Sequence, residues 1–238
     1  MRGSIKRGSM RRRRLAAAAL CLFGTGVAGF GVAWAAPEGT LLNAAETKDH
    51  AGALKLIEQG ADVKAKDVDG TSALHWAAHN SDVELAERLI KAGAEVNVSN
   101  DYGASPMSEA ATLGNAGMLK VLLKAGADVE SPNPEGQTAL MAVARTGDLE
   151  AAKVLLGHRA KVDAVEQWGG QTALMWAAAQ SQPQMIELLL KHRANVNARS
   201  TVRDWQRRVT AEGRPKNMNR GGFTPLLYAA REGCIECA

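Results

Sequence analysis

Aromatic residues, cysteines and catalytic motifs are all scarce in this sequence. Only 4% of its 238 residues are aromatic, whereas apolar residues make up 46% and charged residues 23%. The last two values are ordinary for a folded protein and exclude a wholly disordered chain. Because large aromatic side chains are few while alanine and leucine are plentiful, thin and closely packed helices are favoured over a β-rich core.

The chain has no nucleophile motif, no phosphate-binding glycine loop and no pair of acids with catalytic spacing. His75 has neither a nucleophile nor a second base paired with it. Cys234 and Cys237 have the C-x-x-C spacing of redox and metal sites, but no second such pair and no histidine cluster completes a zinc site. We expect Cys237 to pack in the core, and a disulfide between the two cysteines stays open. The sequence thus predicts no enzymatic activity, no cofactor and no metal.

Net positive charge is confined to two segments. Seven of the 29 basic residues precede position 36, where no acid occurs, so the remainder carries 22 basic and 25 acidic residues. Residues 199–220 hold seven more basic residues against two acids, which leaves 15 basic and 23 acidic residues elsewhere. An acidic body repels phosphate, so we expect no nucleic-acid partner.

Residues 1–35 have the order of a secretory signal peptide. Arg11 to Arg14 end a basic segment, Leu15 to Val32 form an apolar stretch, and Ala33-Trp34-Ala35 place small residues at a cleavage site. We expect export to the periplasm or the cell exterior with removal of this leader, and no membrane contact afterwards. An uncleaved anchor is the alternative, and the export route, Sec or twin-arginine, stays open.

A repeat of about 33 residues governs the rest of the chain. Gly-Ala pairs begin at Gly60, Gly93 and Gly126, and the next copies, at Arg159 and Arg193, keep only the alanine. A second series runs in phase with the first, and its members begin at Ser72, Ser105, Thr138, Thr172 and Thr224. Its last step is longer by about 19 residues, as expected where a repeat array carries an insertion in a loop.

Each unit combines a glycine turn, a Ser or Thr that suits a helix N-cap, an alanine-rich helix and a second helix with larger apolar residues. Ser72-Ala73-Leu74-His75 and the closing Gly93-Ala94 show the pattern most fully. This pattern resembles the ankyrin-repeat family, and the resemblance covers residues 40–238. It implies an all-α solenoid of helix–turn–helix units with β-turn tips, a structural hydrogen-bonding role for His75, and binding through the turn tips and first helices.

The resemblance divides the chain into five segments. Residues 1–35 are the signal peptide, 36–66 an N-terminal capping repeat, 67–200 four full repeats, 201–219 a basic insertion and 220–238 a partial repeat. Val202 to Ala211 within the insertion is compatible with a short helix that Gly213 and Pro215 would end. Since the last unit lacks its closing Gly-Ala, we expect either a truncated product or a piece of a longer protein.

Candidate partner-binding residues are those that the family pattern places on tips, on exposed first-helix positions or in the insertion. Aromatic residues at tips are unusual, and tyrosine, tryptophan and arginine are enriched among interface hot spots. The alternative is that each aromatic packs on its own neighbour, and that the insertion only neutralises the acidic array. The predicted set is Tyr102, Arg145, Trp168, Trp205, Arg207, Arg208, Phe223 and Arg231.

These features predict an exported, monomeric, non-catalytic scaffold that binds another protein. The main alternative is a docking portion of a larger enzyme or toxin whose active domain lies beyond residue 238. Binding of an anionic polymer or membrane surface through the insertion is a third possibility. The fold serves too many functions to identify the partner.

Overall fold

The computed structural model describes residues 39–205 and 218–238. The leader, with its cleavage site, and the insertion residues Arg207 and Arg208 lie outside these ranges. Among the described residues, no helix has both the length and the apolar character needed to cross a membrane.

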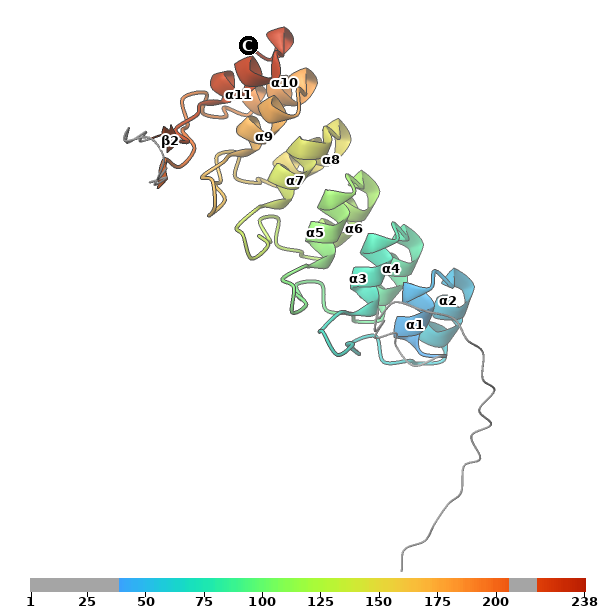
Figure 1. Ribbon diagram of the computed structural model, residues 1–238. Coiled ribbons are helices and arrows are strands. Elements are labelled where there is room, and N and C mark those ends of the chain that lie inside the picture. Colours follow the sequence, from blue (N-terminus) through green and yellow to red (C-terminus); the bar gives the residue numbers. More distant parts are fainter. Residues whose placement is uncertain (1–38, 206–217) are drawn as a thin grey trace, which may run out of the picture. The chain divides into compact units, whose positions relative to one another are not determined.

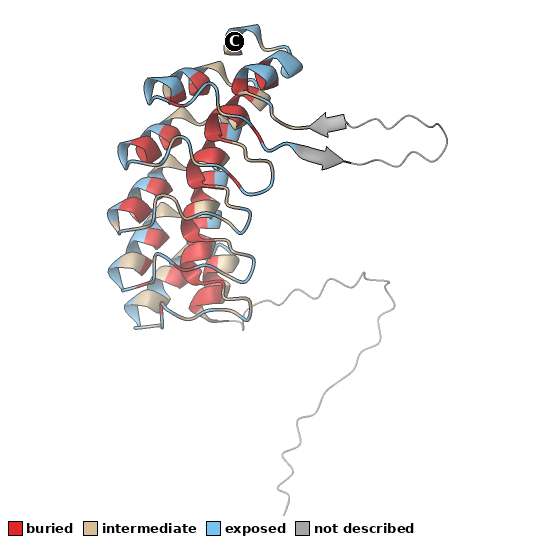
Figure 2. Ribbon diagram, turned by 90° about the vertical axis from the view of Figure 1, so that its left-hand side faces the viewer, coloured by how far each residue is buried: buried red, intermediate tan, exposed pale blue. Residues whose placement is uncertain are grey.

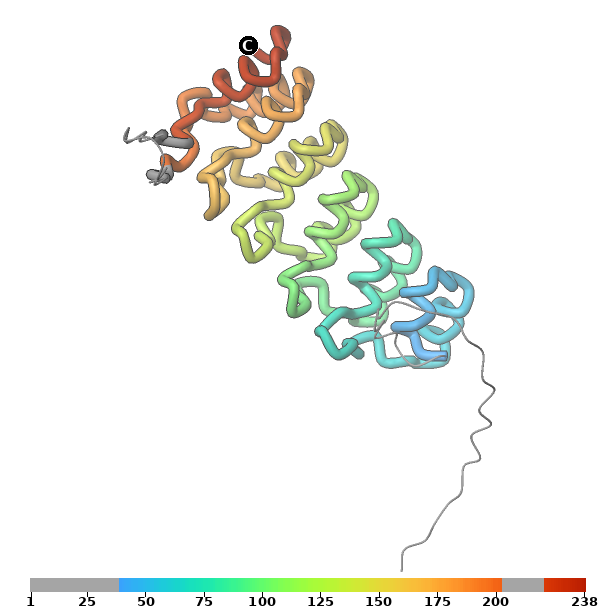
Figure 3. The backbone as a smooth tube through the Cα atoms, in the orientation of Figure 1, coloured from blue at the N-terminus to red at the C-terminus, as the bar shows by residue number. Residues whose placement is uncertain are grey.

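Helix pairs stack side by side in chain order (Figures 1 and 3). Each unit contributes a first helix that contacts the first helices of its neighbours, and a second helix that contacts the second helices. The first helices are α1 (Leu41–Glu46), α3 (Ala73–His79), α5 (Pro106–Thr112), α7 (Ala139–Thr146), α9 (Ala173–Ala179) and α11 (Pro225–Glu232). The second helices are α2 (His50–Glu58), α4 (Val83–Lys91), α6 (Ala116–Lys124), α8 (Leu149–Gly157) and α10 (Pro183–Lys191), and the last unit ends in a short 3-10 helix, η1 (Ile235–Cys237).

The predicted caps form as expected. Five hydroxyls each accept a hydrogen bond from the backbone N–H three residues further along the chain, and they belong to Thr40, Ser105, Thr138, Thr172 and Thr224. Gly93 and Gly126 follow their helices with φ of +97° and +88°. Arg159 and Arg193, which replace glycine in later units, hold the same left-handed conformation, with φ of +65° and +66°. The helices therefore end in the same way at both arginines, although a left-handed conformation is unfavourable for a residue with a Cβ.

Alanine pairs let the first helices approach closely. Ala77, Ala110, Ala144, Ala177 and Ala229 have no or almost no exposed surface. Leucine and methionine from the second helices complete a continuous core, seen in Figure 2 as the buried column that runs through the stack. Because no single unit buries its own apolar face, the core is shared between neighbours.

The insertion departs from the predicted helix. Residues Arg203–Trp205 form strand β1, which pairs antiparallel with β2 (Met218–Arg220), so the helix expected from Val202 to Ala211 is wrong at least over 203–205. Valine and tryptophan, found here at positions 202 and 205, are typical strand formers. Whether these residues form a strand or a helix depends on the cross-strand partner, which the sequence pattern does not reveal. The all-α prediction holds for the repeats, and this ribbon is an addition to it.

Candidate functional site

Two of the tips are turns in which one acceptor side chain binds several backbone N–H groups. The Asn100 side-chain oxygen accepts from the backbone N–H groups of Tyr102 (3.1 Å) and Ala104 (2.9 Å). At the equivalent place two units later, the Glu166 carboxylate accepts from the N–H groups of Trp168 (2.6 Å), Gly169 (2.7 Å) and Gln171 (3.0 Å). Residues that project from these tips are therefore presented on a fixed backbone.

Backbone bonds link one tip to the next. The Asp101 N–H donates to the Asp69 carbonyl (2.8 Å), Gln167 to Glu135 (2.9 Å) and Thr201 to Gly169 (2.7 Å). Pro134 occupies the corresponding position between the first two of these links and has no N–H to donate.

The predicted aromatic residues do project, though not equally. Tyr102 is 74% exposed and Trp168 is 62% exposed. Phe223 is 37% exposed and packs edge-on against Tyr228, with ring centroids 5.6 Å apart. Much of the Phe223 side chain is therefore covered by its own neighbour, as the alternative interpretation of the tip aromatics expects.

The arginines of the predicted set are differently placed. Arg145 is exposed on α7. Arg231 is also exposed, but it forms an ion pair with Glu232 (2.7 Å), and its guanidinium lies 5.1 Å from the centroid of the Tyr228 ring. Trp205 belongs to β1. The predicted residues thus fall on several units, and only Trp168, Phe223 and Arg231 come from the two units that flank the insertion.

An open groove lies between the tip of residues 166–171 and the base of the insertion. It encloses about 650 Å³ and combines aromatic, acidic, amide and hydroxyl side chains. Its lining consists of Glu135, Gln137, Glu166, Trp168, Gly169, Gln171, Trp176, Ser200, Thr201, Gly221 and Tyr228.

Two aromatic residues of the groove come from first helices, Trp176 from α9 and Tyr228 from α11. The Gln171 side-chain amide donates to the Tyr228 hydroxyl (2.8 Å), whereas the buried Trp176 indole N–H has no hydrogen-bond partner among the described residues. Trp176 packs against the shared core, and Tyr228 is buried in it. Their place beside Trp168 was missed, because repeat alignment alone does not show which tips and helices enclose a hollow.

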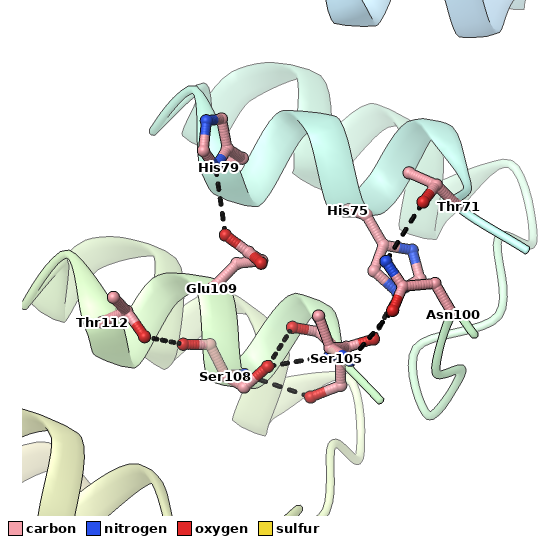
Figure 4. Close-up of polar contacts among 9 residues, drawn as sticks. Thr71, His75, His79, Asn100, Ser105, Ser108, Glu109 and Thr112 are labelled. Carbon is pink, nitrogen blue, oxygen red and sulfur yellow. Dashed lines mark hydrogen bonds and ion pairs between the residues drawn. The ribbon is translucent and has the colours of Figure 1, made fainter. Parts of the chain in front are cut away.

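His75 has the structural role that the family pattern implies (Figure 4). Its Nδ1 accepts from the Ser72 backbone N–H (3.1 Å), and its Nε2–H donates to the Ala104 carbonyl of the next unit (3.0 Å). Burial lowers the pKa of His75. His79, one turn on, is exposed and bonds Glu109 (3.0 Å).

His50 joins the first two units by charge. Its ring bonds Asp82 (2.7 Å) and lies 3.4 Å from Glu84. The hydrogen bond that the His50 ring donates to the Asp82 carboxylate raises the pKa of His50. Because His50, Asp82 and Glu84 lie at the surface, the arrangement is a pH-dependent link and has no nucleophile.

Cys234 and Cys237 are joined by a disulfide, which resolves the alternative that the sequence leaves open. Cys237 is partly buried against the core, in agreement with a packing role. No group of three or more potential metal ligands occurs in the described ranges.

A family model for ankyrin repeats, described as three copies, matches residues 41–133 and 125–200. No curated protein matches the chain.

Proposed function

The chain belongs to the ankyrin-repeat family, whose members are generally protein-interaction modules and typically non-catalytic, and from this premise we propose that it is an exported scaffold that binds another protein. The observation that carries the proposal is the set of aromatic side chains held out on rigid tips, above all Trp168 at the edge of the groove. Fixed, exposed aromatic residues lose little entropy on binding and are typical interface anchors.

We infer that the binding surface extends from the tips to the insertion. The insertion begins at Thr201, which lines the groove, and it carries Trp205, Arg207 and Arg208. A segment that the repeat phase does not need, with tryptophan among arginines, has the composition of a binding element. Arginines there would pair with carboxylates of the partner and give an affinity that weakens with salt.

The test is capture of a partner from a bacterial periplasmic extract by the purified protein and three variants. Replacing residues 201–219 by a Gly-Ser linker, or Trp168→Ala, should each remove most of the captured protein. Lys153→Ala, on the exposed side of α8, should not. If capture survives both changes, the proposed surface is wrong. If the linker variant unfolds in circular dichroism, the insertion is a structural brace instead.

Export is tested by intact mass. Protein recovered from expressing bacterial cells should lack residues 1–35. A full-length cytosolic protein would contradict export, and a full-length membrane-bound form would favour an anchor. The alternative function, a docking portion of a larger enzyme or toxin, would use the same surface. The gene sequence beyond codon 238 distinguishes this alternative from a scaffold.

A further inference from the structure

We propose that the groove beside Trp168 binds a lysine or arginine side chain of the partner, presented on an extended segment. The inference rests on the proposed function, because it specifies the chemistry of the partner at that surface. It adds Glu135, Gln171, Trp176 and Tyr228 to the binding site.

The charge of the groove favours a cation. Its two ionisable acidic residues are Glu135 and Glu166, and no lysine or arginine is among its lining residues. Glu166 is buried, and its carboxylate is occupied by three backbone N–H groups of its own tip. Glu135 is exposed and has no ion pair within the described part of the chain. A carboxylate at the rim of a hollow that has no ion pair with the described residues attracts a basic ligand.

The aromatic residues favour the same ligand. A cation that lies within about 6 Å of an aromatic ring centroid is attracted by the negative face of the ring. Trp168 offers an exposed indole to the groove, and Trp176 and Tyr228 lie on the helices behind it. The chain already uses this chemistry next to the groove, where the Arg231 guanidinium lies 5.1 Å from the Tyr228 centroid.

The remaining lining suits a polypeptide. Gln137, Gln171 and Thr201 carry amide and hydroxyl groups that hydrogen-bond peptide groups. The groove is open to solvent, and its volume of about 650 Å³ accommodates a few residues of an extended chain. An enclosed pocket for a small metabolite would bury its ligand far more completely.

The probes are four blocked pentapeptides, Gly-Gly-X-Gly-Gly, in which X is lysine, arginine, norleucine or glutamate. Nuclear magnetic resonance of the indole N–H signals of the purified protein follows their binding, with each signal assigned by a single Trp→Phe change. The lysine and arginine peptides should shift the Trp168 signal at low salt with a Kd on the order of 1 mM. Glu135→Gln and Trp168→Ala should each weaken binding about fivefold, the latter read from the Trp176 signal. Tyr102→Ala, the matched exposed aromatic on a tip outside the groove, should leave the Kd unchanged.

Equal binding of the norleucine peptide would overturn the inference, because the groove would then recognise apolar bulk. Preference for the glutamate peptide, absence of any shift, or equal weakening by Tyr102→Ala would overturn it as well. None of these results affects the proposed function, since partner capture detects binding of any chemistry. The proposed function would instead be rejected if capture of the partner did not depend on the tips.

Discussion

At the scale of single residues, the structure favours the neutral form of one histidine and the charged form of another. His75 is buried between an obligate donor, the Ser72 N–H, and an obligate acceptor, the Ala104 carbonyl, which fixes the neutral ring in one tautomer. His50 is a surface residue between two carboxylates, which favour its charged form. The sequence allowed the role of His75 to be predicted from its slot in the repeat. The His50 pairing depends on contact between adjacent units and was not predicted.

We predict that His75→Ala lowers the free energy of unfolding by about 2 kcal/mol at neutral pH, since it leaves a buried N–H and a carbonyl unpaired. His79→Ala, on the same helix, removes only an exposed ion pair and should cost less than about 1 kcal/mol. Urea unfolding followed by circular dichroism measures both values. Equal losses would contradict the structural role of His75.

The pH dependence of the two histidines should have opposite signs. Burial lowers the pKa of His75, so its contribution to stability is complete well above pH 6.5 and is lost as the pH falls below that value. The pKa of His50 is raised, so its contribution is complete below pH 6.5 and is lost as the pH rises through the folded-state pKa. Titration of the imidazole proton resonances should place His75 below and His50 above 6.5. The reverse order would refute this assignment.

At the scale of elements, turns and helix ends depend on glycines that have different neighbours. Gly103 has φ of +72°, and a Cβ on it would collide with the Pro134 ring of the next tip. Gly93 has φ of +97° and open space around it. The repeat pattern predicted a glycine turn in each unit and a closing glycine at Gly93, but not that Gly103 faces a proline, since that contact forms only when the tips stack.

Gly103→Ala should therefore destabilise the protein more than Gly93→Ala, by about 1–3 kcal/mol. Both alanines bear the strain of a left-handed conformation, and only the first also displaces a rigid ring. Thermal unfolding of the two variants measures the difference. Similar melting temperatures would indicate that the tip of residues 133–138 moves aside at little cost.

The insertion is the element that sequence reasoning described least well. Repeat phase predicted it at residues 201–219, and at its base the Gly222 N–H donates to the Ser200 carbonyl (3.0 Å) and the Ser200 N–H to the Phe223 carbonyl (3.0 Å). Helix was expected inside it, and strands leave and re-enter the array instead. Local propensity failed here because strand pairing joins residues 13 to 17 positions apart in the sequence, which a helical pattern does not register.

At the scale of the whole array, protection should fall toward the last unit. In α11, Leu226 and Leu227 are 54% and 47% exposed, and Ile235 in η1 is 89% exposed, whereas the leucines of α4 and α6 are buried. A unit in a stack is stabilised mainly by its neighbours, so a unit whose apolar face is uncovered opens more easily. We predict that amides of residues 225–232 exchange hydrogen at least about tenfold faster than those of α3, α5 and α7.

The first unit provides the internal control for this prediction. Its α2 presents polar residues such as Lys55 and Glu58 to solvent and buries Ala53, so it should exchange more slowly than α11 although it also lies at an end. Reduction of the Cys234–Cys237 disulfide should speed exchange in the last unit further, because η1 then loses the cross-link between its last residue, Cys237, and the residue that precedes the helix, Cys234. Hydrogen exchange with mass spectrometry, with and without a dithiol reductant, measures both effects. Uniform protection from α3 to η1 would show that α11 gains enough from its contact with α9 to need no covering layer.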